Sequence, residues 1–89
     1  MREELGIIKL TNHRTGRAVT EHIFVGDVMV ICTNHLAQND EESNMELAKG
    51  TVVVIAGLGL STNCVLVQNG DVFHEMNGIW LTRIALLKL

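Results

Sequence analysis

Residues 50–71, GTVVVIAGLGLSTNCVLVQNGD, carry the strongest signals for the fold of this chain. It contains five consecutive β-branched residues at 51–55, a glycine-rich segment at 57–63 and then a second apolar run. β-branched residues favour strands, and an Asn-Gly pair such as the one at 69–70 is a strong signal for a tight hairpin turn. The stretch therefore predicts two antiparallel strands at the centre of a small β-structure.

Short apolar runs on both sides of this stretch predict further strands. The first two runs are separated by a polar segment, residues 12–16, that ends in glycine and suits a hairpin turn. A second Asn-Gly pair, at 77–78, predicts another turn. Short strands with tight turns indicate an all-β fold, a small barrel or roll of about five to seven antiparallel strands with an extra N-terminal hairpin. The expected strands outside the opening stretch span residues 5–11, 17–25, 27–33 and 72–75, with a last strand in which residues 79–81 lead into 84–89.

The polar and acidic segment 34–49 has no strand pattern and is expected to form a long loop that contains a short helical turn. Ser43 and Glu46 have the spacing of a capping box, in which the hydroxyl and the carboxylate each accept a backbone N–H at the start of a helix. A lysine followed by a glycine supplies a cation and a left-handed cap at the other end. We therefore expect the helical turn near residues 43–49.

The chain of 89 residues is expected to form a single domain, residues 1–89, with an aliphatic core. Nearly half of the residues are apolar (47%), but only Phe24, Phe73 and Trp80 are aromatic, so valine, isoleucine and leucine must fill the interior. The acidic start is unlike a secretory signal, and no apolar run is long enough to span a bilayer. Cys32 and Cys64 lie inside apolar runs, which favours reduced thiols and a cytoplasmic location.

An ordered series of motifs runs from residue 24 to residue 87. It consists of Val25-Gly26-Asp27-Val28, an acidic loop, Lys49-Gly50-Thr51-Val52, Val65-Leu66-Val67 and a last short apolar strand. This order resembles that of small bacterial and phage SH3-like barrels. The resemblance implies that the glycines form turns and that the apolar positions fill a barrel. The resemblance carries no catalytic residue and suggests a small phage or bacterial accessory protein. The hairpin before Phe24 departs from the minimal pattern of these barrels.

The glycine-rich segment opens like a dinucleotide-binding Gly-x-Gly-x-x-Gly loop and follows a predicted strand. Its sixth position is Thr62, and a strand is expected after it where a dinucleotide site requires a helix. Without that helix no N-terminus is available for a pyrophosphate. We therefore expect the segment to be a hairpin connection, and we expect no bound cofactor.

Two groups of titratable residues have spacings that metal sites or active sites use. A Cys-His pair at 32–35, with Cys64, offers ligands, but a structural zinc site has a second close pair, which this chain lacks. Asp71, His74 and Glu75 form an acid–histidine cluster, yet on a strand the histidine faces away from both carboxylates. No serine or cysteine is adjacent in sequence to act as a nucleophile. The protein is therefore predicted not to be an enzyme, and metal binding is not favoured.

Leu58 and Leu60 lie at the glycine-rich turn and are candidate protein-binding residues, together with Met45 in the acidic segment. Two interpretations of the leucines are open: they seal the end of the protein's own core, or they contact a partner. The strand at 51–55 is apolar on both faces, although a small barrel has one interior. The second face must be covered by the N-terminal hairpin, by the acidic segment or by another subunit, and we expect a homo-oligomer.

Basic residues from the two ends of the chain support an alternative function, nucleic-acid binding. Lys9, Arg14, Arg17 and Arg83 would form a modest phosphate-facing patch if the fold brings these ends together. A net charge of -3 and the scarcity of aromatic residues for base stacking argue against this as the main function. The sequence favours a non-enzymatic protein-interaction module that self-associates, with nucleic-acid binding and small-molecule or metal binding as alternatives.

Overall fold

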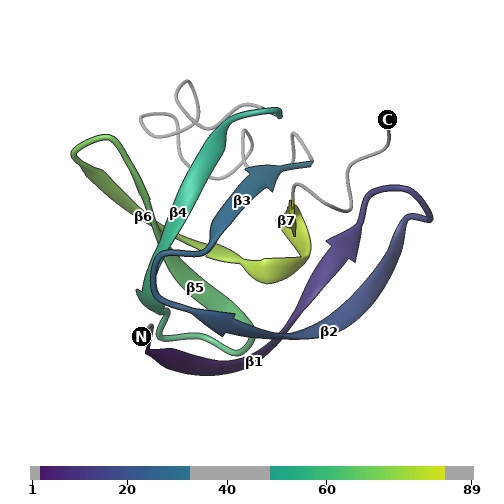
Figure 1. Ribbon diagram of the computed structural model, residues 1–89, viewed down its shortest axis with the longest axis horizontal. Coiled ribbons are helices and arrows are strands. Elements are labelled where there is room, and N and C mark those ends of the chain that lie inside the picture. Colours follow the sequence, from purple (N-terminus) through teal and green to yellow (C-terminus); the bar gives the residue numbers. More distant parts are fainter. Residues whose placement is uncertain (1–2, 33–48, 84–89) are drawn as a thin grey trace.

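Seven strands and one 3-10 turn make up the part of the chain that the computed structural model describes, residues 3–32 and 49–83 (Figure 1). The expectation of an all-β class with an N-terminal hairpin is confirmed. In chain order the elements are β1 (Glu4–Asn12), β2 (Arg17–Phe24), β3 (Val28–Ile31), β4 (Val52–Leu58), β5 (Cys64–Asn69), β6 (Val72–Asn77), the turn η2 (Gly78–Trp80) and β7 (Leu81–Arg83).

The strands form two antiparallel sheets. β1 pairs with β2, and the second sheet has the order β6-β5-β4-β3-β7. Strands β3 to β6 pair in chain order as a meander, whereas β7 returns to pair with the other side of β3. Residues 50–71 thus contain the β4–β5 hairpin at the centre of the larger sheet.

The turns of this hairpin and the next follow the glycine signals. Gly70 has a φ of 65° and, with Asp71, forms the two-residue connection between β5 and β6. The first position of a tight hairpin loop needs a positive φ, which glycine adopts without strain. The glycine-rich segment connects β4 to β5, and β5 begins at Cys64, so a strand follows where a dinucleotide site needs a helix.

The structure differs from the predicted strand at 79–81. Ile79 and Trp80 belong to η2, and only Leu81 is in a strand. The cause is Asn77, whose side chain Oδ1 accepts a hydrogen bond from the Ile79 N–H at 3.0 Å and so starts a turn in place of a strand. The predicted strand at 84–89 and the predicted helical turn near 43–49, Lys49 apart, lie outside the described residues.

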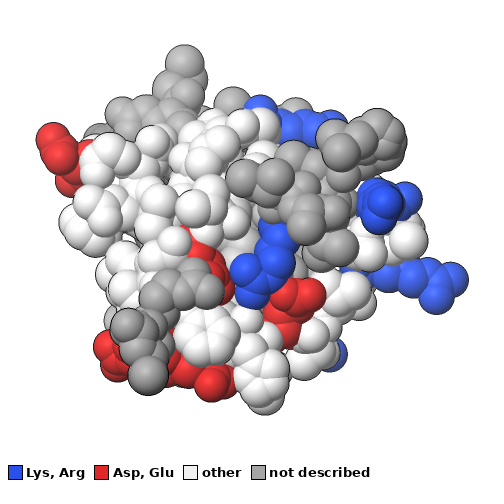
Figure 2. Space-filling model, viewed as in Figure 1, with Lys and Arg blue, Asp and Glu red and all other residues white. Residues whose placement is uncertain are grey.

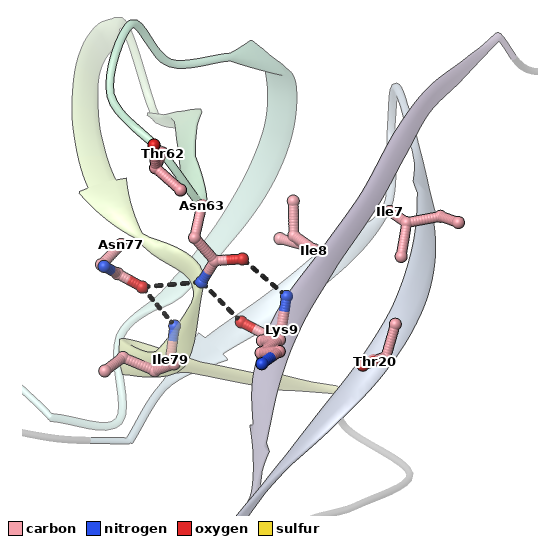
Figure 3. A pocket seen from close by; sticks show the side chains of 8 residues that line it. All are labelled: Ile7, Ile8, Lys9, Thr20, Thr62, Asn63, Asn77 and Ile79. Atoms are coloured by element: carbon pink, nitrogen blue, oxygen red, sulfur yellow. Dashed lines mark hydrogen bonds between the residues drawn. The ribbon is translucent and has the colours of Figure 1, made fainter.

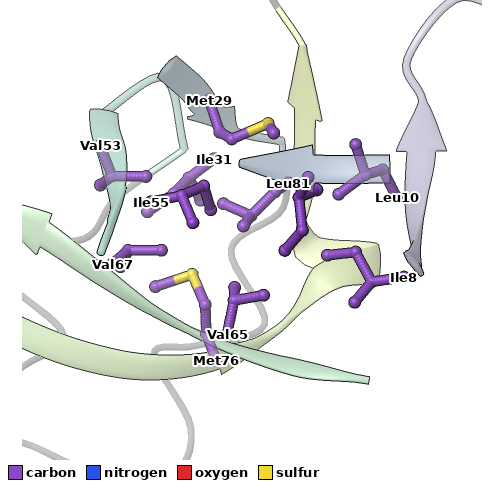
Figure 4. Close-up of a cluster of buried hydrophobic side chains, with 11 residues drawn as sticks. Ile8, Leu10, Met29, Ile31, Val53, Ile55, Val65, Val67, Met76 and Leu81 are labelled. Atoms are coloured by element: carbon purple, nitrogen blue, oxygen red, sulfur yellow. The ribbon is translucent and has the colours of Figure 1, made fainter. Parts of the chain in front are cut away.

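The hydrophobic core lies between the two sheets, and each of the seven described strands contributes to it (Figure 4). The N-terminal hairpin supplies three of its residues, so this hairpin is part of the interior and does not cover the second face of β4. The larger sheet supplies the rest, with inward-facing residues alternating along β4 and β5. The buried apolar cluster consists of Ile8, Leu10, Ile23, Met29, Ile31, Val53, Ile55, Val65, Val67, Met76 and Leu81.

Charged groups join the hairpin to the larger sheet. Arg83 on β7 forms an ion pair with Glu21 on β2 and donates a hydrogen bond to the His22 carbonyl at 2.8 Å. It also lies 3.4 Å from the Asp27 carboxylate, which is only 3% exposed. Asp27 accepts a further hydrogen bond from the Phe24 N–H at 3.0 Å. Buried charges are stable when they are paired and hydrogen-bonded in this way, so Asp27 anchors the junction between the sheets.

Candidate functional site

The two predicted binding leucines lie at and beside the connection between β4 and β5, residues 59–63, which we call the tip. Leu58, the last residue of β4, is 51% exposed, and Leu60 is 97% exposed. Leu58 pairs across the sheet with the core residue Val65, which places it at the rim of the interior. Leu60 is almost fully exposed, so it does not seal the core between the two sheets.

The tip is held in place from β6. A carboxylate oxygen of Glu75 accepts hydrogen bonds from the N–H groups of Leu60 at 2.8 Å and Ser61 at 3.3 Å. Gly59 fits against the same carboxylate, since a Cβ at this position would lie 2.6 Å from the oxygen. An exposed leucine on an anchored backbone loses little conformational freedom when it binds a partner.

The other end of the tip is held by Asn63, which has a φ of 60° (Figure 3). Its side chain accepts a hydrogen bond from the Lys9 N–H at 2.7 Å and donates to the Lys9 carbonyl at 3.1 Å. It also donates to Asn77 Oδ1 at 2.8 Å. A groove of about 370 Å³ lies between β1 and this end of the tip, with Ile7, Thr20 and Ile79 also in its wall.

The outward face of the larger sheet carries a row of cross-strand neighbours, Val28, Val54, Gln68 and Phe73, which we call the outer row. Val28 pairs with Val54, Val54 with Gln68, and Gln68 with Phe73, so the row crosses four strands. Its three apolar members are 42%, 37% and 53% exposed. Among the outward-facing described positions of β4, β5 and β6, Glu75 alone is charged, and its carboxylate is bound to the tip.

A second hollow lies at the opposite end of β4 from the tip. This β4-start groove has a volume of about 400 Å³, and most of its wall is apolar. Val52, which is 53% exposed, forms one side of the groove. The rest of the described wall includes Val30, Ile31, Cys32, His13 and Lys49.

The two cysteines are reduced and are not paired with each other. Burial raises the pKa of the Cys32 thiol above its ordinary value of 9.0, although hydrogen bonding and Lys49 partly oppose the effect. Burial, together with the Glu75 carboxylate, raises the pKa of the Cys64 thiol. The thiolate is the nucleophile in cysteine chemistry, so neither thiol has the lowered pKa of a reactive cysteine.

The basic residues of the alternative hypothesis are only partly brought together. Lys9, Arg14 and Arg17 are exposed on the β1–β2 hairpin. Arg83 faces the acidic side chains of Glu21 and Asp27, so its guanidinium is engaged within the protein. Figure 2 shows blue side chains along the right edge, where Figure 1 places the β1–β2 loop.

The acid–histidine cluster divides as strand geometry predicts. Glu75 lies on the outward face and binds the tip, whereas His74 lies next to the buried Met76 on the strand and has an unbonded Nε2 within the described structure. Within residues 3–32 and 49–83, no three histidine, cysteine, aspartate or glutamate side chains approach closely enough to hold a metal ion. Met45, the third predicted binding residue, and His35 lie outside the described residues.

Two anchors of the site, Glu75 and Asn63, were not expected from the sequence. Asn63 carries a local signal, since asparagine at the end of a glycine-rich turn favours the left-handed conformation. The role of Glu75 has no local signal, because its partners lie 14 and 15 residues away.

Comparison of the chain with protein-family models, with curated proteins and with solved structures finds no match. None of the described residues forms a helix long and apolar enough to cross a membrane. The function must therefore be inferred from the surface of the molecule itself.

Proposed function

We propose that this protein is a non-enzymatic interaction module of the SH3-like kind that associates with further copies of itself. The observation that carries the proposal is the exposure of apolar side chains on the outward face of the larger sheet, Val28, Val54 and Phe73 of the outer row. Leu58 and Leu60 add exposed apolar surface at and beside the tip. The N-terminal hairpin enters the core and leaves this second face of β4 uncovered. Scattered exposed apolar residues are common in monomers, but a contiguous group marks a contact surface.

Two observations support the SH3-like part of the proposal. Gly26 and Gly50, from the motifs that carry the resemblance, have φ values of 95° and 94° in the turns before β3 and β4. Val65 and Val67, from the third motif, are fully buried. These are the roles that the resemblance implies for its glycines and apolar positions. A cytoplasmic accessory role in a phage or bacterium belongs to the same proposal.

A second copy is the partner that this surface fits best. The outer row has an apolar residue at three of its four positions and no charge, so a charged partner would gain no ion pair from it. The buried centres of homodimer interfaces are more apolar than the rest of a protein surface. An uncharged apolar face is therefore complementary to itself.

Light scattering over a wide range of protein concentration tests the proposal. We expect a mass above the 9.8 kDa of one chain that rises with concentration. Val54→Lys places a charge in the outer row without touching the core and should lower the mass at a given concentration. Thr20→Lys, at an exposed position on β2, is the matched control and should leave the mass unchanged. A mass of 9.8 kDa at every concentration would contradict self-association.

Nucleic-acid binding is the second candidate, favoured by the exposure of Lys9, Arg14 and Arg17 on one hairpin. Arg83, the fourth predicted cation of the patch, is instead paired with Glu21 and Asp27. Affinity for a short duplex should fall steeply with added salt if these cations contact phosphates. No binding at low salt, or binding that salt does not weaken, would remove this candidate.

A further inference from the structure

Strand β6 is a free edge of the larger sheet. It comes first in the order β6-β5-β4-β3-β7, and no described strand pairs with its far side. Figure 1 shows the β5–β6 turn at the left margin of the molecule. The residues outside the described ranges adjoin β1, β3, β4 and β7 in the chain, whereas both neighbours of β6, the turn to β5 and η2, are described.

The backbone of β6 offers hydrogen bonds along this edge. Because the connection at 70–71 has two residues, Asn69 and Val72 form a hydrogen-bonded pair, and bonded and non-bonded pairs alternate from there along the hairpin. Phe73 and Glu75 fall in non-bonded pairs, so their N–H and C=O groups point away from β5. None of the described hydrogen bonds uses these backbone groups. They can therefore bond an added strand.

The edge lacks the features that keep sheet edges from pairing. Natural edges carry lysine, proline or a bulge, or another segment covers them. β6 has neither lysine nor proline and keeps an unbroken register with β5. Its one carboxylate, that of Glu75, is held by the N–H groups of the tip. At the edge of β1, by contrast, the Asn63 side chain bonds both backbone groups of Lys9.

The charges of the hairpin select one register for the pairing of two copies of β6. The free groups of Phe73 and Glu75 meet those of a second copy, about a two-fold axis, in three antiparallel registers. Phe73 opposite Phe73 sets Glu75 opposite Asp71, and Glu75 opposite Glu75 sets two carboxylates face to face. Like charges directly opposite are destabilising. Only Phe73 opposite Glu75 keeps the carboxylates apart.

This register also brings the outer rows of two copies together. Phe73 is the last member of the outer row and is 53% exposed. In this register it is the diagonal neighbour of Phe73 in the second copy, at about 7–8 Å, a separation that aromatic side chains bridge. The two rings can pack on each other, and the apolar surface of one row continues into the next.

We infer that β6 of one copy pairs antiparallel with β6 of a second copy, with Phe73 of each opposite Glu75 of the other. The contact is isologous, so it closes at two copies and joins their larger sheets into one. This inference rests on the proposed self-association and adds a contact along the sheet edge. Both outer rows stay on one side of the joined sheet, so contact through the outward face is still open to them.

Amide hydrogen exchange resolved by residue tests the edge contact. In the wild type, the Phe73 and Glu75 amides should exchange about tenfold more slowly at a concentration where light scattering shows assembly than in dilute protein. The His74 amide, which bonds β5, should be protected at both concentrations. Val54→Lys, which blocks the outward face two strands away, should keep the concentration-dependent protection at the edge and associate only to twice the 9.8 kDa of one chain.

The possible outcomes separate this contact from the proposed function. Fast exchange of the Phe73 and Glu75 amides in assembled protein overturns the edge pairing and leaves association through the outward face standing. Protection that is the same at every concentration also overturns it, because another part of the same chain would then cover the edge. A wild type that stays at 9.8 kDa throughout overturns the proposed self-association itself.

Disulfide formation tests the register. His74 faces His74 of the second copy in a non-bonded pair, where Cα atoms are about 4.5 Å apart, within the range of a disulfide. A His74→Cys variant should therefore form a disulfide between copies under mild oxidation. Val72→Cys is the control, because the two copies of position 72 would lie about 13 Å apart along the strands. Peptide mapping that finds no link between the two positions 74 in assembled protein, or an equal yield for Val72→Cys, overturns this register.

Discussion

The Asn63 side chain pairs with both backbone polar groups of Lys9, 54 residues earlier in the sequence. It accepts from the Lys9 N–H at 2.7 Å and donates to the Lys9 carbonyl at 3.1 Å, the two bonds that a neighbouring strand would make. One amide thus completes the edge of β1 and ties the N-terminal hairpin to the tip. The same amide is bonded to Asn77, which starts η2, so three segments meet at one side chain.

Replacing Asn63 should therefore loosen the hairpin. Asn63→Ala leaves the Lys9 N–H and carbonyl without partners and places alanine at a φ of 60°, and we expect a loss of about 2 kcal/mol in the free energy of unfolding. Asn63→Gly removes the same bonds without the backbone strain and should cost less. Thr62→Ala, one residue away and exposed, is the control. Urea unfolding measures all three, and equal stability of Asn63→Ala and wild type would contradict the bridge.

The close packing of η2 against β1 at Gly78 predicts a contrast between two glycines, Gly78 and Gly57. A Cβ at Gly78 would lie 2.7 Å from the Lys9 carbonyl oxygen and 2.8 Å from the Ile8 side chain, whereas a Cβ at Gly57 would meet nothing within 4 Å. Gly78→Ala should destabilise the fold by about 1–3 kcal/mol, since overpacking forces the backbone to move. Gly57→Ala should change the free energy of unfolding little. Thermal unfolding of the two variants side by side measures the difference.

The Arg83 ion pairs predict energetic coupling between the sheets. Arg83→Met removes the ion pair with the buried Asp27 carboxylate and the bond to the His22 carbonyl, so we expect a loss of about 2 kcal/mol in the free energy of unfolding. Glu21→Gln should cost less, because Glu21 is partly exposed. A double-mutant cycle with both changes should give a coupling energy near 1 kcal/mol. Additive effects would show that the pair contributes nothing to stability.

The raised thiol pKa values predict slow alkylation and sensitivity to alkaline pH. The thiols of Cys32 and Cys64 have a higher pKa in the folded protein than in the unfolded chain, so they stay protonated to a higher pH when the protein is folded. Their contribution to stability is therefore complete below about pH 9 and is lost as the pH rises above that value, where the unfolded thiols ionise first. Iodoacetamide should react more slowly with native protein than with urea-unfolded protein at pH 8, and Cys32→Ser should reduce the alkaline loss of stability. Equal rates in the two states would contradict the shift.

The sequence predicted the strands well where the signal was local. Residues 52–55 and 64–67 lie in β4 and β5, because β-branched and alternating apolar residues favour a pleated surface. The turn at Gly70 follows from the freedom of glycine at positive φ. The strand predicted over Ile79 and Trp80 failed because a single side chain, that of Asn77, hydrogen-bonds the local backbone and starts a turn.

The candidate site was less predictable. Leu58 and Leu60 were chosen from their place beside glycines, but sequence alone left open whether they face the core or the solvent. The position of the tip depends on hydrogen bonds to Glu75 and between Asn63 and Lys9, which join it to β6 and β1. In the same way, Arg83 resembled a phosphate-binding cation in the sequence, and the fold places it against Glu21 and Asp27.

Local patterns in the sequence account for the all-β class, the position of the central hairpin and the second apolar face of β4. These depend on propensity and on the two-residue period of a strand, which are properties of neighbouring residues. Long-range contacts are needed to place the N-terminal hairpin in the core, to anchor the tip from which Leu60 projects and to form the groove at the other end of β4. The reason is physical: contacts such as Asn63 with Lys9 and Arg83 with Glu21 join residues 54 and 62 positions apart, and no local pattern specifies them.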